Sequence, residues 1–266
     1  METLALIGVG LCSGLLGGML GIGGGVVIVP ALIFAYELSG MKAAADVTVI
    51  AVATSMSCII FTSFSAAYTQ YRAKKVKMDV VRRLVPFFVL GSLCAGLSTP
   101  LFDPGLLRLL IGAFLLLVAI VMLRSWKPNP TRQFPGPVGS GATGLIGGFV
   151  SGTAGIAGGN VIVPTLLYFN TPVHNATATS SAMGVPIALA GAVGYALGSP
   201  AASSTWMLGL IDLQSWLAIT VGAIIAAPAG VRIAHRVPAD LLKKVFGAFL
   251  VLVSLRMLYS SAGLFG

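Results

Sequence analysis

The amino-acid sequence predicts an all-α polytopic membrane protein made of two inverted-topology repeats. First, 57% of the 266 residues are hydrophobic and only 9% are charged, which is too little polar surface for a water-soluble fold. Second, the apolar runs reach the roughly 20 residues that a membrane-spanning helix needs. Third, residues 10–32 recur as residues 144–166, with 13 of 23 positions identical and no gap. Nearly the whole chain is therefore expected in a bilayer, as a unit that occurs twice.

Each predicted membrane segment is an apolar run bounded by charged residues, glycine or proline. The runs cover 4–36, 43–69, 80–100, 105–125, 138–169, 175–198, 213–234 and 238–262. As one helix, the first run would be about 50 Å long, against a hydrocarbon core of about 30 Å. We therefore expect each repeat to be a broken or re-entrant helical hairpin plus three transmembrane helices, giving eight to ten membrane segments. Sequence alone leaves open whether the broken segments re-enter or span.

Glycine marks the position of both breaks. The first break is expected within Gly21 to Gly25, and the second among Gly155, Gly158 and Gly159. A proline follows each glycine run, at Pro30 and Pro164. Hydrophobic segments that glycine and proline interrupt at corresponding places of two halves are the best sequence pointer to a transporter binding site.

The repeat boundaries and the basic residues predict the topology. We divide the chain into a first transmembrane repeat (1–125), a cytoplasmic linker (126–137) and a second transmembrane repeat (138–266). Of the 16 lysines and arginines, 13 lie in loops 72–83, 124–132 and 232–244. Basic loops favour the cytoplasmic side. All three loops lie on the cytoplasmic side only if each broken segment enters the membrane and returns to the side from which it came. In that arrangement the two halves have opposite orientations in the membrane, and both termini face the outside.

The helices that are expected to start after the breaks, at Val26 in the first half and near Asn160 in the second, are candidate anion sites. A helix start exposes unpaired N–H groups and the positive end of the helix dipole, and glycine lets an oxyanion approach the backbone. Hydroxyl residues follow each broken segment, and these hydroxyls fit a substrate contact and a hydrogen bond between helices equally well. Asn160 stands where the first repeat has Val26, so the two half-sites are unequal. The candidate substrate-binding residues are Gly23, Gly24, Gly25, Val26, Thr54, Ser55, Gly158, Gly159, Asn160, Thr179 and Ser180.

Other residue patterns predict structural roles. Two consecutive GxxxG patterns are expected to pack helices, and they are compatible with a homodimer as well as with internal packing. They comprise Gly10, Gly14, Gly18, Gly144, Gly148 and Gly152. Asp212 is expected to lie at the interface, in a surface or capping role. Arg108 and Arg256, near outer helix ends, are expected to extend toward the headgroups.

Several function classes are disfavoured by the residue inventory. The three cysteines and two histidines show no metal-ligand spacing, no nucleotide motif is present, and no GxSxG sequence supports an intramembrane enzyme. We therefore expect no catalytic residue, no metal and no cofactor. The net charge of +9 comes from basic residues clustered in the loops, where they orient the protein in the membrane and contact anionic lipid headgroups. Binding of nucleic acid is not expected. The expected partners are a small anionic substrate and the lipid bilayer.

The ordered motifs resemble a known family. GMLGIGGGVVIVPAL, its second copy ending in GGNVIVPTL, the ATS triplets at 53–55 and 178–180, and the closing segments from Leu106 and Leu241 resemble the sulfite exporter TauE/SafE family of membrane permeases, of the 4-toluene sulfonate uptake permease type. The resemblance covers essentially the whole chain. It implies export of a small sulfur-containing anion, such as sulfite, sulfoacetate or a related organosulfonate, across the bacterial cytoplasmic (inner) membrane. A secondary transporter working by alternating access fits this, and a passive anion channel or permease for another small oxyanion or carboxylate is the alternative.

Overall fold

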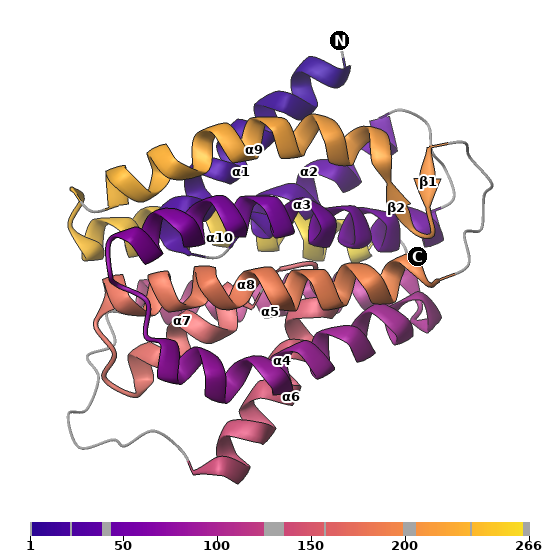
Figure 1. Cartoon of the computed structure of the whole chain (residues 1–266). Coiled ribbons are helices and arrows are strands. Elements are labelled where there is room, and N and C mark those ends of the chain that lie inside the picture. The colour runs from indigo at the N-terminus through magenta and orange to yellow at the C-terminus, as the bar shows by residue number, and fades with distance from the viewer. Residues whose placement is uncertain are drawn as a thin grey trace.

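The computed structural model of the protein describes residues 2–21, 23–38, 44–124, 136–156, 158–198, 206–234 and 236–262 (Figure 1). These residues form ten α-helices, one short 3-10 helix and one small β-hairpin. Most of the predicted linker 126–137 and of the basic loop 124–132 lies outside the described residues, as does His235 of the third basic loop.

The two halves contain the same succession of helices. The elements of the first half are α1 (Glu2–Leu20), α2 (Gly25–Leu38), α3 (Ala44–Arg72), α4 (Met78–Ser98), the 3-10 helix η1 (Thr99–Leu101) and α5 (Pro104–Leu123). Those of the second half are α6 (Pro137–Thr153), α7 (Gly159–Tyr168), α8 (Val173–Ala196), β1 (Met207–Leu208), β2 (Ile211–Asp212), α9 (Leu213–Ala234) and α10 (Ala239–Ala262). Each half thus has a helix pair broken at glycine, followed by three further helices.

Among the described residues, six helical stretches are long and apolar enough to cross a membrane. They are Thr3–Leu20, Val47–Arg72, Met78–Leu101, Pro104–Leu123, Val173–Ala196 and Leu213–Ala234. Helices α2 and α7 are shorter, with 14 and 10 residues. The all-α polytopic membrane fold predicted from the sequence is therefore confirmed.

Two aspartates fix where the helices α5 and α9 begin. The carboxylate of Asp103 accepts a hydrogen bond from the N–H of Leu106 at 2.9 Å, and Pro104 occupies the first position of α5. The carboxylate of Asp212 accepts from the N–H of Gln214 at 3.0 Å, at the start of α9. Both contacts satisfy N–H groups that a helix start leaves unpaired. Of the surface or capping role predicted for Asp212, the structure shows the capping role.

The pair α1–α2 is a hairpin whose two open ends lie together. Residues Thr3 to Val9 of α1 and Ala31 to Leu38 of α2 line one cavity. The next helix begins at the same end, because Thr48 of α3 and Glu37 of α2 both bind Arg108. The chain therefore enters at this end, turns at the glycines and returns before α3 crosses.

The pair α6–α7 opens at the other end of the bundle. Helix α6 runs parallel to α4, because Gly144 lies against Phe87 while Gly152 lies against Ser92 and Ala95. The start of α8, which follows α7, is tied to the loop before α4 by a 2.8 Å hydrogen bond from Asn175 Nδ2 to the carbonyl of Lys75. Which end faces the cytoplasm stays a prediction from the basic loops.

Small residues bring α1 against α9. The α-carbons of Gly10, Gly14 and Gly18 lie so near the α9 backbone at Ile219, Ala223 and Ala227 that a β-carbon would overlap it. Close approach of this kind is what GxxxG patterns permit. In the second half Gly148 meets the backbone of Phe88 in α4 in the same way. The GxxxG glycines therefore pack helices, as predicted, and they do so within the chain, which is one of the two possibilities that the sequence left open.

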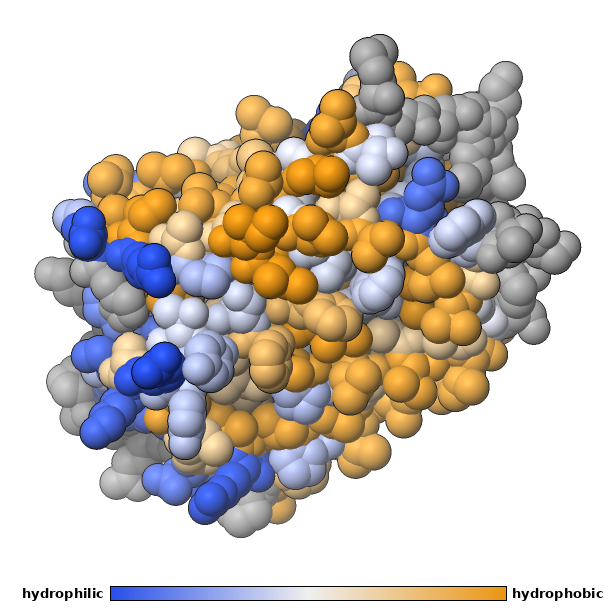
Figure 2. Space-filling model, turned by 45° about the horizontal axis from the view of Figure 1, so that its top comes forward, coloured by the Kyte–Doolittle hydropathy of each residue, from blue (hydrophilic) through white to orange (hydrophobic). Residues whose placement is uncertain are grey.

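The outer surface has the polarity of a protein in lipid. Apolar side chains cover most of the face in Figure 2, while polar ones gather toward one end. Large exposed hydrophobic residues occur on most of the long helices, for example Phe64 on α3, Leu117 on α5 and Leu252 on α10. The lysines of the loop before α4, Lys74, Lys75 and Lys77, are exposed. The protein is a multi-pass membrane protein.

Candidate functional site

The first break is a tight glycine turn between α1 and α2. Gly21, Gly23 and Gly24 have φ angles of 69°, 72° and 81°, in the left-handed region that glycine adopts without strain. A β-carbon on Gly24 would lie 2.6 Å from the carbonyl oxygen of Ser13. The carbonyl of Gly24 accepts from the N–H groups of Val27 and Ile28, so α2 begins directly after the turn. The sequence placed this start at Val26, one residue later than the structure.

The second break has the same construction. Gly155 and Gly158 have φ angles of 68° and 74°. The carbonyl of Gly158 accepts from the N–H groups of Val161 and Ile162, as Gly24 does in the first half. Helix α7 therefore starts at Gly159, beside the Asn160 predicted from the sequence.

The two breaks lie against each other in the interior. Gly25, the first residue of α2, is so close to Gly155 and Ile156 that a β-carbon there would lie 3.1 Å from the α-carbon of Ile156. Gly21 packs in the same way against the backbone of Thr177 in α8. The start of α2 therefore lies against the second break, and the first break lies against α8. A meeting of the starts of α2 and α7 stays a prediction.

The four predicted hydroxyl residues each reach into the opposite half. The hydroxyl of Ser55 donates to the carbonyl of Gly155 at 2.9 Å, and that of Ser180 donates to the carbonyl of Gly21 at 2.8 Å. Thr54 accepts from the N–H of Asp212 at 3.0 Å, and Thr179 accepts from the N–H of Lys77 at 3.0 Å. These residues hold the breaks and the starts of α9 and α4 in place. Their contact with a substrate stays a prediction.

Asn160 has buried amide atoms without partners. Its side chain is 2% exposed, and neither Nδ2 nor Oδ1 has a hydrogen-bond partner among the described residues. Buried polar atoms are nearly always paired, so each exception calls for an explanation such as an absent water or ion. The equivalent residue of the first half, Val26, is fully buried and apolar. The two breaks therefore differ at this position, where the sequence predicted unequal half-sites.

All eleven candidate residues are buried and lie at the breaks or on the helices that pack against them. The site has backbone N–H groups at two helix starts, one unpaired carboxamide and no charged side chain among the eleven. No three His, Cys, Asp or Glu side chains of the described residues lie together as a metal site would require. Such a set of neutral donors suits a small anion.

The location of Arg108 differs from the expectation. It does not extend to the headgroups: its side chain is 3% exposed, with Nε donating to Thr48 Oγ1 at 2.7 Å and Nη1 paired with Glu37 Oε1 at 2.8 Å. The sequence expectation was wrong because it could not show that α2 and α3 lie over the guanidinium. Arg256 is exposed, and its guanidinium lies 4.2 Å from the ring centroid of Phe34 in a cation–π contact.

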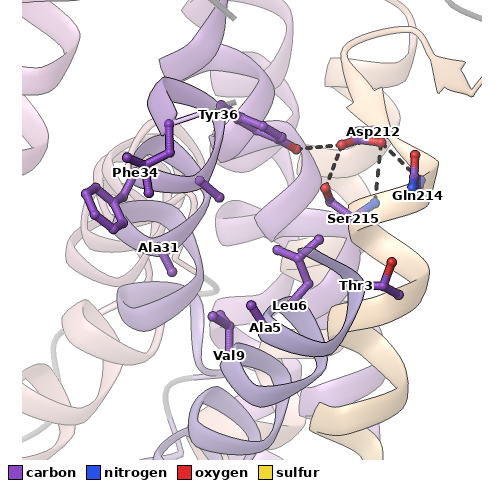
Figure 3. Close-up of a pocket in the computed structure, with 12 residues that line it drawn as sticks. Thr3, Ala5, Leu6, Val9, Ala31, Phe34, Tyr36, Asp212, Gln214 and Ser215 are labelled. Carbon is purple, nitrogen blue, oxygen red and sulfur yellow. Dashed lines mark hydrogen bonds between the residues drawn. The ribbon is translucent and has the colours of Figure 1, made fainter. Parts of the chain in front are cut away.

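Sequence reasoning also missed a polar cluster around Asp212. Figure 3 shows Tyr36 of α2 directed at the carboxylate, with Ser215 and Gln214 of α9 beside it. The hydroxyl of Tyr36 donates to Asp212 Oδ2 at 2.8 Å, and that of Ser215 donates to the same oxygen at 2.6 Å. No motif links residues so far apart in the chain.

Comparison with known proteins assigns the chain to a family. The profile of the family described as sulfite exporter TauE/SafE matches residues 6–257. The chain belongs to this family. It is similar to a probable membrane transporter protein of Haemophilus influenzae, with 28% identity over 94% of this chain and 95% of the relative. It is also similar to the probable membrane transporter protein YunE of Bacillus subtilis, with 26% identity over 97% of this chain and 98% of the relative. A probable membrane transporter protein of Methanocaldococcus jannaschii is 27% identical over 95% of this chain and 94% of the relative. No solved structure matches.

The family and these relatives make the protein a membrane transporter. As a multi-pass member it fits the bacterial inner membrane, as predicted. The relatives' names state no substrate.

Proposed function

We propose that the protein is a secondary carrier that exports a small sulfur-containing oxyanion by alternating access, and that the anion binds where the two glycine breaks meet. The observation that carries this proposal is the buried, unpaired carboxamide of Asn160 at the start of α7. Its Nδ2 can donate two hydrogen bonds to an anion oxygen. The family resemblance supports sulfite, sulfoacetate or a related organosulfonate.

The chemistry of the site suits an anion that must be released again. Helix starts and a carboxamide stabilise negative charge with partial charges, without the full opposite charge of an arginine or lysine. A carrier needs binding that is favourable but reversible on each side of the membrane. The absence of a charged side chain from the eleven residues supports turnover rather than tight storage.

Export also fits the electrical driving force. An interior-negative potential favours outward movement of an anion by about 2.3 kcal/mol per charge for each 100 mV. An exporter of this kind would need no nucleotide hydrolysis.

Transport by purified protein in liposomes tests the proposal. Vesicles loaded with unlabelled sulfite should take up labelled sulfite by counterflow, and uptake should saturate. Sulfoacetate, isethionate, sulfate, acetate and chloride as competitors define the substrate class. Anion conductance without counterflow would favour the alternative, a passive anion channel, and no flux of any sulfur oxyanion would overturn the proposed substrate.

A further inference from the structure

A cavity of about 470 Å³ lies between the start of α1, the end of α2 and the start of α9 (Figure 3). Its walls are mainly apolar, with Leu6 and Val9 on one side and Ala31 and Phe34 on the other. Tyr36, Asp212 and Ser215 form its polar end. The volume is in the range of roughly 300–1,000 Å³ that is typical of small-molecule sites. The cavity is distinct from the eleven residues at the glycine breaks.

The carboxylate of Asp212 holds a negative charge at the polar end of this cavity. Four neutral groups donate to it: the hydroxyls of Tyr36 and Ser215 at 2.8 and 2.6 Å, and the N–H groups of Gln214 and Ser215 at 3.0 and 3.4 Å. These donors fix the orientation of the carboxylate. They bring only the partial positive charge of the start of α9. No lysine, arginine or histidine among the described residues forms an ion pair with Asp212, and the guanidinium of Arg256 is engaged with the ring of Phe34.

A fixed charge beside apolar walls selects the chemistry of the occupant. Low-dielectric walls concentrate the field of the carboxylate within the cavity, which favours a cation. The apolar walls favour burial of hydrocarbon, at about 25 cal/mol per Å². A bare metal ion would use the charge but gain nothing from the walls. An alkyl chain ending in an ammonium group would use both.

We infer that this cavity binds an ammonium group that carries an apolar chain, with the ammonium at Asp212 and the chain along Phe34 and Leu6. An aminophospholipid headgroup and a free alkylamine present the same chemistry. The cavity also touches the transport machinery, since the N–H of Asp212 donates to Thr54, and the neighbouring Ser55 holds Gly155 of the second break. Binding itself does not depend on the proposed anion transport.

Thermal unfolding of the purified full-length protein with hexylammonium tests the inference. We expect a saturable rise in the unfolding temperature, with hexanol and hexanoate producing no comparable rise. In Asp212→Asn the apparent Kd for hexylammonium should rise at least tenfold. Asparagine caps helices as well as aspartate and can still accept from Tyr36, so this variant should fold. Asp79→Asn, which alters an exposed acid on α4, is the matched control and should bind normally.

Nanodiscs distinguish the two sources of the ammonium group. If the occupant is a lipid, phosphatidylethanolamine added to phosphatidylcholine nanodiscs should stabilise wild type but not Asp212→Asn, and should compete with hexylammonium. If the occupant is a free amine, hexylammonium should bind equally in both kinds of nanodisc. Equal hexylammonium affinity in wild type and Asp212→Asn would overturn the inference. The inference would also be overturned if hexanol raised the unfolding temperature as much as hexylammonium does. A rise in the unfolding temperature with sodium chloride but not with hexylammonium would overturn it too.

Discussion

Ser55 and Ser180 make equivalent hydrogen bonds in opposite directions across the centre of the molecule. Ser55 of the first half donates to Gly155 in the break of the second half, and Ser180 of the second half donates to Gly21 in the break of the first. Each hydroxyl has a single hydrogen, and here that hydrogen is used by a glycine carbonyl. Each half therefore holds the glycine turn of the other half in shape.

Ser55→Ala and Ser180→Ala should each destabilise the protein by about 1 to 2 kcal/mol, because a buried glycine carbonyl loses its donor. The fall should appear in thermal or denaturant unfolding. Ser65→Ala is the matched control, since the hydroxyl of Ser65 donates to the carbonyl of Ile224 at an exposed position. If the serine hydroxyls only contacted substrate, both variants would unfold like wild type in the absence of anion, which would contradict the holding role.

Asn160→Leu should separate stability from binding. Replacing an unpaired buried carboxamide by an apolar group of similar size removes a desolvation cost, so the unfolding temperature should stay equal or rise. The stabilisation that sulfite or a sulfonate gives to wild type should disappear. Asn175→Ala is the matched control: it removes an amide bonded to Lys75, and we expect lower stability with anion affinity retained. Normal anion affinity in Asn160→Leu would remove the main support for the proposed site.

The helix breaks could be predicted from sequence because they are local. Run length, the dense glycines near Gly24 and Gly158, and the following prolines each argue against a continuous helix. The duplication then indicated which residues correspond. The predicted ends of the membrane segments lie within a few residues of the helix ends in the structure, because these ends too are marked by local residues.

The partners of these residues could not be predicted, because they depend on contacts between segments far apart in the chain. Nothing near Thr54 in the sequence indicates that it accepts from the N–H of Asp212, and nothing near Arg108 indicates that Glu37 and Thr48 cover it. The short hairpin of β1 and β2, with Gly209 at a φ of 57°, was also missed. Strands of two residues are too short for a periodic pattern.

Gly24→Leu and Gly158→Leu should abolish anion binding in a protein that still inserts into the membrane. Both positions have φ angles in the left-handed region, which a leucine rarely adopts. A β-carbon at Gly24 would lie 2.6 Å from the carbonyl oxygen of Ser13, and one at Gly158 would lie 2.9 Å from the side chain of Ile162, so both breaks would be forced to change shape. The measurement is anion-dependent thermal stabilisation of protein purified from membranes. Gly8→Leu, where a β-carbon would find open space, is the control and should bind normally. Normal affinity in both break variants would place the substrate elsewhere.

Glu37→Ala should destabilise the protein more than Arg108→Met, although both remove the same ion pair. Arg108 is 3% exposed, whereas Glu37 is 43% exposed. Without Glu37 the guanidinium stays buried with only Thr48 as partner, a situation that typically costs about 3 kcal/mol or more. Without Arg108, the carboxylate of Glu37 reaches water and methionine fills the buried space, so we expect a loss of about 1 kcal/mol. Denaturant unfolding of the two single variants and the double variant measures the asymmetry. Equal losses in the two single variants would mean that the pair behaves as a surface contact and that Arg108 is hydrated in the membrane.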